Sequence, residues 1–119
     1  VYSFYSNKKT LDLPNASKVE FSHVHGGATT TIYECDESKI SSLIKDIEEK
    51  SSYSKESVND TPNDVDYIKV KMDTKTYYVY ERHGKTYIEE PYNGIWKITS
   101  DLYKSIKQNK DKLIMEYED

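Results

Sequence analysis

The chain of 119 residues contains a single cysteine, Cys35, so it can form neither an intrachain disulfide nor a cysteine-rich metal cluster. It has no run of about 18 apolar residues, the length that a membrane-spanning helix needs. Arginine is also scarce, because Arg82 is the only one among 17 basic residues, and with 21 acidic residues the formal net charge is −4. This balance gives no basic surface for nucleic acid or anionic lipid. We therefore expect no nucleic-acid partner and no membrane contact through the domain itself.

Signatures of catalysis are missing as well. The sequence contains no nucleophile elbow, no phosphate-binding glycine loop and no HExxH motif. Glu89 and Glu90 are neighbours in an expected strand, so they point to opposite faces and cannot work as an acid–base pair. His83 lies in an expected turn without an evident partner. We therefore expect a protein that is not an enzyme and that needs no cofactor.

Metal binding has only weak candidates. His23 and His25 would share one face of an extended strand, but two ligands specify little, and solvated turn residues are the alternative interpretation. Asp60, Asp64 and Asp66 offer oxygen atoms that calcium accepts, yet their spacing does not fit an EF-hand loop. We expect no metal site, with His23 and His25 as the weak candidates for one.

Tyrosine is what the chain does contain. Only 35% of the residues are hydrophobic and 32% are charged, whereas 12 are tyrosines. A tyrosine ring buries apolar area while its hydroxyl stays hydrogen-bonded or wet, so tyrosines can complete a lean core. The length fits one domain. We expect residues 1–14 to be an N-terminal tether and residues 15–119 to form a single α+β domain.

The first half of that domain shows both strand and helix periodicity. Residues 18–24 and 28–34 alternate or are rich in threonine, and a glycine-containing turn between them predicts a hairpin. Residues 39–50 carry apolar side chains at i, i+3, i+4 and i+7, which predicts a helix with one buried stripe. Asp36 or Ser38 can cap it, since either side chain accepts hydrogen bonds from first-turn amides.

Polar residues then separate this half from the rest. Residues 51–64 have no apolar period and predict a loop. At the other end of the domain, Ser100 is expected to cap a second helix over residues 101–108. Residues 109–119 either extend that helix or add an edge strand.

Residues 66–98 are the centre of the domain, and they predict four antiparallel strands joined by short turns. The dipeptides at 83–84 (His-Gly) and 93–94 (Asn-Gly) fit two-residue hairpin turns. These turns set the register: Val79 faces Ile88, Tyr80 faces Tyr87, Pro91 faces Trp96 and Glu90 faces Lys97.

The turn at residues 73–75 decides which side chains enter the core, because one residue of slippage exchanges the two faces of a strand. A three-residue turn would bury Tyr78 and Tyr80 under the helices. A two-residue turn, which we adopt, places them on the opposite face. The helix-covered face then consists of Ile68, Val70, Met72, Tyr77, Val79 and Ile88.

We therefore predict an α+β fold with an antiparallel sheet of about six strands and one or two helices packed on one face. The opposite face would expose rigid tyrosine rings beside basic side chains, a composition typical of surfaces that bind proteins. In the alternative interpretation, this face is covered by the N-terminal segment, the 51–64 loop or the tail. The predicted binding residues are Tyr67, Tyr78, Tyr80, Arg82, Tyr87, Tyr92 and Trp96.

Three segments resemble a known family: SVNDTPN at 57–63, YIKVKM at 67–72 and YVYERHGKTYIEEPYNGIWKI at 78–98. The family consists of uncharacterised small domains from low-GC Gram-positive bacteria, often in chains with features of exported lipoproteins. Members more often carry Gln at Glu90 and Tyr at Trp96. The family has no assigned activity, so the resemblance transfers no functional residue. It implies a location outside the cytoplasmic membrane, either secreted or anchored through a lipidated cysteine upstream of Val1.

The sequence and this resemblance together predict a non-enzymatic, extracytoplasmic binding module for a protein, a peptide or a cell-wall glycan. A second hypothesis is an envelope sensor or an immunity-type lipoprotein. A third is a binder of a metal or small ligand at His23 and His25.

Overall fold

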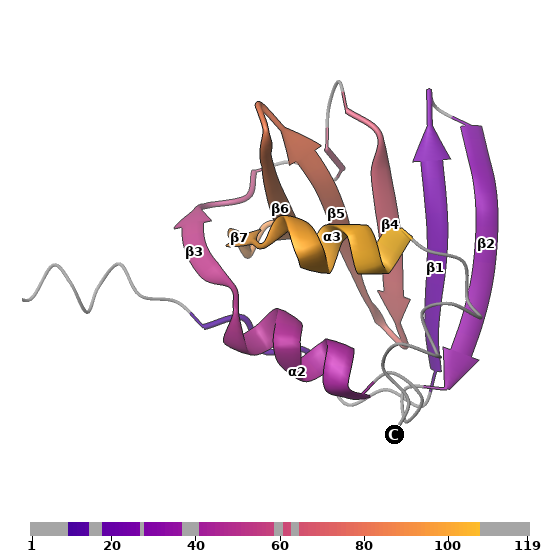
Figure 1. The fold of residues 1–119 in the computed structure, drawn as a ribbon, viewed down its shortest axis with the longest axis horizontal. Helices are drawn as coiled ribbons and strands as arrows, with labels where there is room; N and C mark the ends of the chain where they lie inside the picture. Colours follow the sequence, from indigo (N-terminus) through magenta and orange to yellow (C-terminus); the bar gives the residue numbers. More distant parts are fainter. Residues whose placement is uncertain are drawn as a thin grey trace, which may run out of the picture.

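The computed structural model describes residues 10–14, 18–26, 28–36, 41–58, 61–62 and 65–107. Within them, seven antiparallel strands form one sheet in the order β2-β1-β4-β5-β6-β7-β3, and two helices complete an α+β fold (Figure 1). The predicted fold class is confirmed, with seven strands in place of about six. Neither described helix is long and apolar enough to cross a membrane. The elements are β1 (Lys18–His25), β2 (Ala28–Asp36), α2 (Ser41–Glu49), β3 (Ser52–Lys55), β4 (Tyr67–Met72), β5 (Lys75–Arg82), β6 (Lys85–Glu90), β7 (Gly94–Ile98) and α3 (Ser100–Lys107).

Both helices cover the same face of the sheet. Leu43, Ile44 and Ile47 of α2 are buried in one cluster with Leu102 and Ile106 of α3. These residues recur every three or four positions, so each helix turns one apolar stripe toward the strands, as predicted. The first helix was predicted to begin at residue 39 with Asp36 or Ser38 as its cap. Asp36 ends β2, and residues 37–40 lie outside the described residues.

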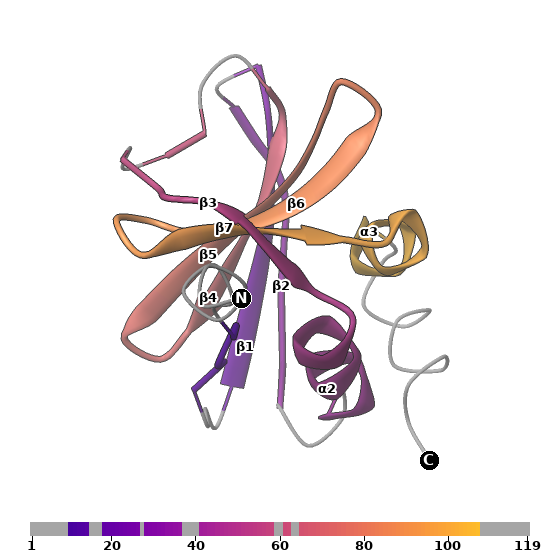
Figure 2. The same cartoon turned by 90° about the vertical axis from the view of Figure 1, so that its left-hand side faces the viewer.

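The chain crosses the sheet twice between its outer strands. β2 and β3 lie at opposite edges, and α2 joins them along the helix-covered face. β4 lies on the far side of β5, β6 and β7 from β3, so the chain after β3 must cross those three strands again. It does so on the other face, away from the helices (Figure 2). We call this second crossing, residues 56–62, the strap; Asn59 and Asp60 within it lie outside the described residues.

The hairpin from β4 to β5 settles the register question. Met72 pairs with Lys75 across a two-residue turn in which Asp73 has a φ of 55°. The two-residue interpretation is thus confirmed, and the six residues assigned to the helix-covered face are all buried. The next hairpin is also as predicted: Tyr80 pairs with Tyr87 across His83 and Gly84, which both have positive φ, as a type I′ turn requires.

The predicted turn at 93–94 is wrong. Glu90 pairs with Gly94, so the connection is three residues long, and the Asn93 amide donates to the Glu90 carbonyl over 3.0 Å. Pro91 and Tyr92 form its centre, and the φ of 62° at Tyr92 makes it a type II turn, which favours proline at the position before. The register therefore differs, and the predicted pairing of Pro91 with Trp96 does not occur.

Two further corrections concern the ends of elements. The 51–64 segment was predicted as a loop throughout, but Ser52–Lys55 forms the edge strand β3 beside β7. Thr99, rather than Ser100, caps α3, because its Oγ1 accepts from the Leu102 amide over 3.2 Å. Residues 109–119, for which a helix or an edge strand was expected, lie outside the described residues.

The segment before β1 belongs in part to the packed domain. Leu11 is 1% exposed and lies in the core cluster, and Leu13 packs against that cluster. The Leu13 amide also donates to Glu48 of α2 over 2.8 Å. Residues 10–14 of the predicted tether therefore pack on the domain, whereas residues 1–9 lie outside the described residues.

Candidate functional site

The tyrosine face predicted as an open binding surface is largely closed. Tyr78 and Tyr80 lie on the face away from the helices, as expected, but they are only 8% and 4% exposed. Tyr67 and Tyr87 are half-buried, and the Tyr67 ring packs edge-on against Tyr78 with 5.1 Å between centroids. The prediction of one contiguous exposed patch is therefore wrong. The alternative interpretation of the 51–64 segment holds in part, because the strap it contains contacts this face.

The two remaining aromatic candidates, Trp96 and Tyr92, lie in different environments. Trp96 is 1% exposed and lies in the core under the helices, since its true partner in the register is Ile88. Its assignment to the binding face is wrong. Tyr92, at the tip of the β6–β7 turn, is 66% exposed. Trp96 also accounts for the glycine at position 94, because a Cβ there would lie only 2.9 Å from the Trp96 Cη2 atom.

Glu89 is the centre of the polar network on this face. Alternation along β6 places its carboxylate on the strap side, where it is only 3% exposed. The Tyr80 hydroxyl donates to Oε1 over 2.9 Å, and the Ser57 hydroxyl of the strap donates to Oε2 over 2.5 Å. Ser57 Oγ in turn accepts from the Tyr92 amide over 3.0 Å. One serine thus joins the strap to both β6 and the turn that follows it.

The electrostatics of Tyr80 agree with this direction of donation. Burial, followed by the hydrogen bond to Glu89 and the charge of Glu89, raises the pKa of the Tyr80 hydroxyl well above its usual range. The phenol therefore keeps its proton and donates it to the carboxylate. Among the residues that the structure describes, no cationic group lies within ion-pair distance of Glu89, and its hydrogen-bond partners are the hydroxyls of Tyr80 and Ser57. A carboxylate held by neutral hydroxyls is costly to bury and marks a candidate functional site.

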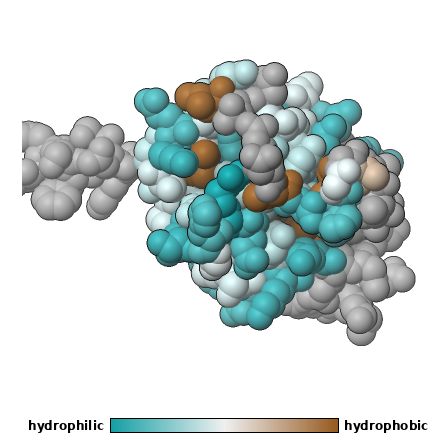
Figure 3. Space-filling view, turned by 90° about the horizontal axis from the view of Figure 1, so that it is seen from above, coloured by the Kyte–Doolittle hydropathy of each residue, from teal (hydrophilic) through white to brown (hydrophobic). Residues whose placement is uncertain are grey.

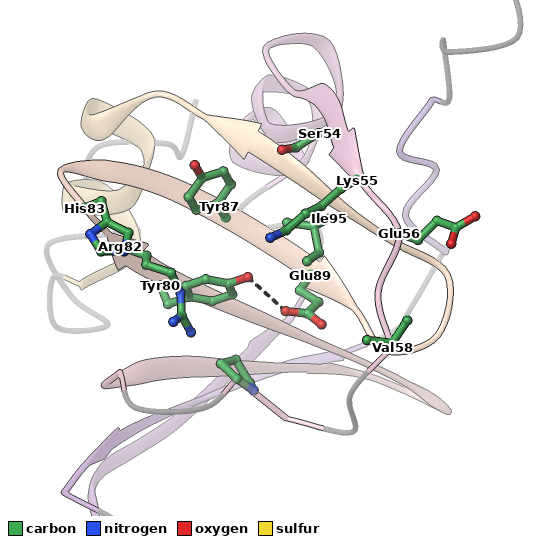
Figure 4. Close-up of a pocket in the computed structure, with 11 residues that line it drawn as sticks. Ser54, Lys55, Glu56, Val58, Tyr80, Arg82, His83, Tyr87, Glu89 and Ile95 are labelled. Carbon is green, nitrogen blue, oxygen red and sulfur yellow. Dashed lines mark hydrogen bonds between the residues drawn. The ribbon is translucent and has the colours of Figure 1, made fainter.

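A groove of about 490 Å³ opens beside Glu89, between the sheet and the strap (Figure 4). Its volume lies within the range of about 300–1,000 Å³ that is usual for small-ligand sites. Arg82 lies 5.7 Å from the centre of the Tyr80 ring, and the Tyr80 and Tyr87 rings are tilted with centroids 5.8 Å apart. The lining residues are Tyr80, Arg82, His83, Tyr87, Glu89 and Ile95 of the sheet and its turn, and Ser54, Lys55, Glu56, Val58 and Pro62 of β3 and the strap.

The histidine pair is elsewhere, at the β1–β2 turn. The rings of His23 and His25 lie 6.4 Å apart, so the expected proximity is present. His25 Nδ1 bonds Asp66 Oδ2 over 2.5 Å, and the Gly26 amide donates to Asp66 Oδ1 over 3.1 Å. The Gly26 hydrogen bond and then His25 lower the pKa of Asp66. Nowhere in the described ranges do three or more metal-ligating side chains gather as a metal site would need.

Of the residues that line the groove, the sequence predicted Tyr80, Arg82 and Tyr87 as binding residues and not Glu89. It also gave no prediction for Ser57, whose hydroxyl holds the Glu89 carboxylate. Alternation assigned Glu89 to the correct face, but its burial depends on a strap more than 25 residues earlier in the chain. Ser57 carried a signal only through its place in the SVNDTPN segment, whose resemblance to a family names no function.

The comparisons with known proteins identify the family and nothing more specific. Neither the curated proteins nor the solved structures contain a match to this chain. A family model named DUF5301, described as "Domain of unknown function (DUF5300)", matches residues 7–97, from within the predicted tether into β7. That range includes the strap, Glu89 and every residue that lines the groove. The chain belongs to this family of domains of unknown function.

Proposed function

We propose that this protein is a non-enzymatic binding module whose site is the groove between the strap and the strands β5 and β6. The observation that carries the proposal is the Glu89 carboxylate, buried at 3% exposure and held by two hydroxyls at the wall of a 490 Å³ cavity. An apolar side chain at this position would make the fold more stable, because burying a charge costs free energy. A polar ligand is a physical reason to keep a carboxylate in that position.

The groove replaces the open tyrosine surface as the proposed site. Tyr80, Arg82 and Tyr87 stay in the proposal because they line the groove. Tyr67, Tyr78 and Trp96 leave it because they do not line the groove, and Trp96 faces the opposite side of the sheet. Tyr92 is exposed on the turn after β6 but does not line the groove either, so it also leaves the proposed site.

A pull-down from the envelope fraction of the source cells tests the proposal. The bait is the wild-type domain, compared with Tyr87→Ser and with Arg82→Gln, both changes to the floor of the groove. Tyr67→Ser is the matched control, because it removes a half-buried tyrosine on the same face but outside the groove. We expect partners that both groove variants lose and the control retains. Identical partner sets for all four baits would exclude the groove as the binding site.

The proposed place of action is outside the cytoplasmic membrane, with a lipid anchor or as a secreted protein. Support for it comes from the resemblance to extracytoplasmic domains of Gram-positive bacteria. Fractionation of cells that carry the full gene product, with palmitate labelling, tests it, and recovery only from the cytosol would contradict it. The sensor or immunity hypothesis predicts one dominant protein partner in the pull-down in place of wall material.

A further inference from the structure

The described residues that line the groove carry charges of both signs. Among its described lining residues, Lys55 and Arg82 are cationic, and Glu56 and Glu89 are carboxylates. A cationic ligand would meet Lys55 and Arg82, and an anionic ligand would meet both carboxylates, so each would lose on one side what it gains on the other. A neutral ligand that carries both donors and acceptors can pair with all four groups. Charge complementarity therefore favours an uncharged, polar occupant.

The hydrogen-bonding groups fit hydroxyls in particular. Lys55, Arg82 and the Ser54 hydroxyl can donate, whereas the two carboxylates only accept. Each oxygen of Glu89 accepts one hydroxyl in the structure, and a carboxylate oxygen has room for a second donor. A hydroxyl both donates and accepts, so a polyhydroxylated ligand can satisfy this mixed lining in many orientations.

The accessible apolar groups of the groove are the ring of Tyr87 and the side chain of Val58, which is 70% exposed. Tyr80 and Ile95 are buried, at 4% and 7% exposure, and Pro62 is buried as well, whereas Tyr87 is half-buried. Tyr87 therefore offers the accessible aromatic face, onto which the C–H side of a sugar ring can stack. Peptide grooves instead take specificity from pockets that accept alternate side chains. Among the coloured residues of the face drawn in Figure 3, the hydrophobic ones form separate patches between hydrophilic ones.

We infer that the ligand of the groove is a neutral oligosaccharide, with a sugar ring on Tyr87 and hydroxyls bonded to Glu89, Arg82 and Lys55. The inference rests on the proposed function and names its ligand class. A single hexose would use the ring and one or two of the charged groups. A short chain of sugars would also reach Ser54 and Glu56 at the rim.

NMR titration of the ¹⁵N-labelled domain tests this inference with four probes. Chitotetraose and maltotetraose are neutral oligosaccharides, the deacetylated chitotetraose has the same backbone with positive charges, and N-acetyl-tetraalanine amide is a neutral peptide. We expect one or both neutral sugars to shift the amides of Tyr87, Glu89 and Ser54 in a saturable way at up to about 10 mM, a concentration suited to weak sites. We expect the cationic tetramer to bind no more tightly than chitotetraose, because its attraction to Glu56 and Glu89 is offset by its repulsion from Lys55 and Arg82.

Variants connect the shifts to the proposed contacts. Tyr87→Ala is expected to weaken sugar binding by about tenfold or more through the lost ring face. Tyr92→Asn is the matched control, because it removes an exposed ring outside the groove and asparagine tolerates the positive φ at this position. Circular dichroism and thermal unfolding of both variants verify that they fold.

Each outcome of these titrations either supports or overturns the inference. Saturable sugar binding that Tyr87→Ala weakens and Tyr92→Asn does not would support the inference. It would be overturned by a lack of shifts with both neutral sugars, by preference for the cationic tetramer, or by sugar binding that Tyr87→Ala leaves unchanged. Binding of the peptide alone, with loss in Tyr87→Ala, would overturn the oligosaccharide and leave the proposed binding groove in place.

Discussion

Replacing Ser57 with alanine should destabilise the fold, because this hydroxyl makes one buried and one partly buried hydrogen bond. It donates to Glu89 over 2.5 Å and accepts from the Tyr92 amide over 3.0 Å, and Ser57 is only 5% exposed. A hydrogen bond to a charged group contributes about 1.5–3 kcal/mol, and a neutral one about 0.5–1.5 kcal/mol. Both are lost together in Ser57→Ala.

The two ranges sum to about 2–4.5 kcal/mol. Since Glu89 borders a groove, water can enter and solvate the carboxylate in the variant, which recovers part of the first contribution. We therefore expect Ser57→Ala to lower the free energy of unfolding by about 2–3 kcal/mol. For a domain of this size, that corresponds to a drop in Tm of about 6–15 °C.

Urea denaturation followed by tryptophan fluorescence measures this effect. Trp96 is the only tryptophan and is buried in the core, so its emission reports global unfolding. Ser52→Ala is the matched control, because Ser52 is exposed at the start of β3, and we expect it to stay within about 0.5 kcal/mol of wild type.

A double-mutant cycle with Glu89→Gln identifies the cause. If Ser57 stabilises the fold through Glu89, the losses of unfolding free energy in the two single variants should add up to more than the loss in the double variant. The difference should be about 1 kcal/mol or more. A loss below about 0.5 kcal/mol for Ser57→Ala, or strict additivity with Glu89→Gln, would refute the stabilising role of the contact between the strap and Glu89.

Three further predictions use the same unfolding measurements. Gly94→Ala should lower the free energy of unfolding by about 1–3 kcal/mol, because the added methyl group overpacks against Trp96. Gly84→Asn should cost less, because Gly84 lies in open space at a type I′ turn. Equal losses in the two variants would contradict the packing argument. The hydroxyl of Tyr77 is buried without a hydrogen-bond partner among the described residues, so Tyr77→Phe should raise stability by about 1 kcal/mol, and a loss of stability would refute it. Burial raises the pKa of Tyr77 and Tyr80 in the folded state, so above pH about 10 the unfolded chain binds fewer protons than the folded one, and stability should fall as pH rises. Tyr80→Phe should make that fall shallower between about pH 9 and 11, and an unchanged slope would count against it.

The hairpins show how far a sequence can specify this fold. His83 and Gly84 were predicted as a two-residue turn and adopt it, because both flanking strands have strong alternation and the dipeptide tolerates positive φ at both positions. The same rule failed at Asn93 and Gly94. There Pro91 favours a type II turn that starts two residues earlier, and Gly94 is needed for the space beside a tryptophan and not for its backbone freedom.

The missed strand and the missed site have a common cause in long-range contacts. Ser52–Lys55 contains one aromatic residue, Tyr53, among exposed polar ones, so local pattern gives little strand signal, and the pairing with β7 stabilises it. Tyr78 and Tyr80 were assigned to the correct face of the sheet. Their burial could not be predicted, because alternation tells which face a side chain occupies but not what lies over that face.

The strap has a consequence for how the domain assembles and opens. Strands β4 to β7 follow one another along the chain and pair with their sequence neighbours, so these hairpins close short loops and are expected to form early. We expect the strap to dock after β3 has joined the far edge of the sheet. The Ser57 hydroxyl of the strap makes one hydrogen bond to β6 and one to the turn after it. We expect the amides of the strap and β3 to exchange with deuterium through local opening at lower free energy than those of β5 and β6. Under the proposed function, this local opening is the route by which a ligand enters the groove while the sheet and the helices stay folded.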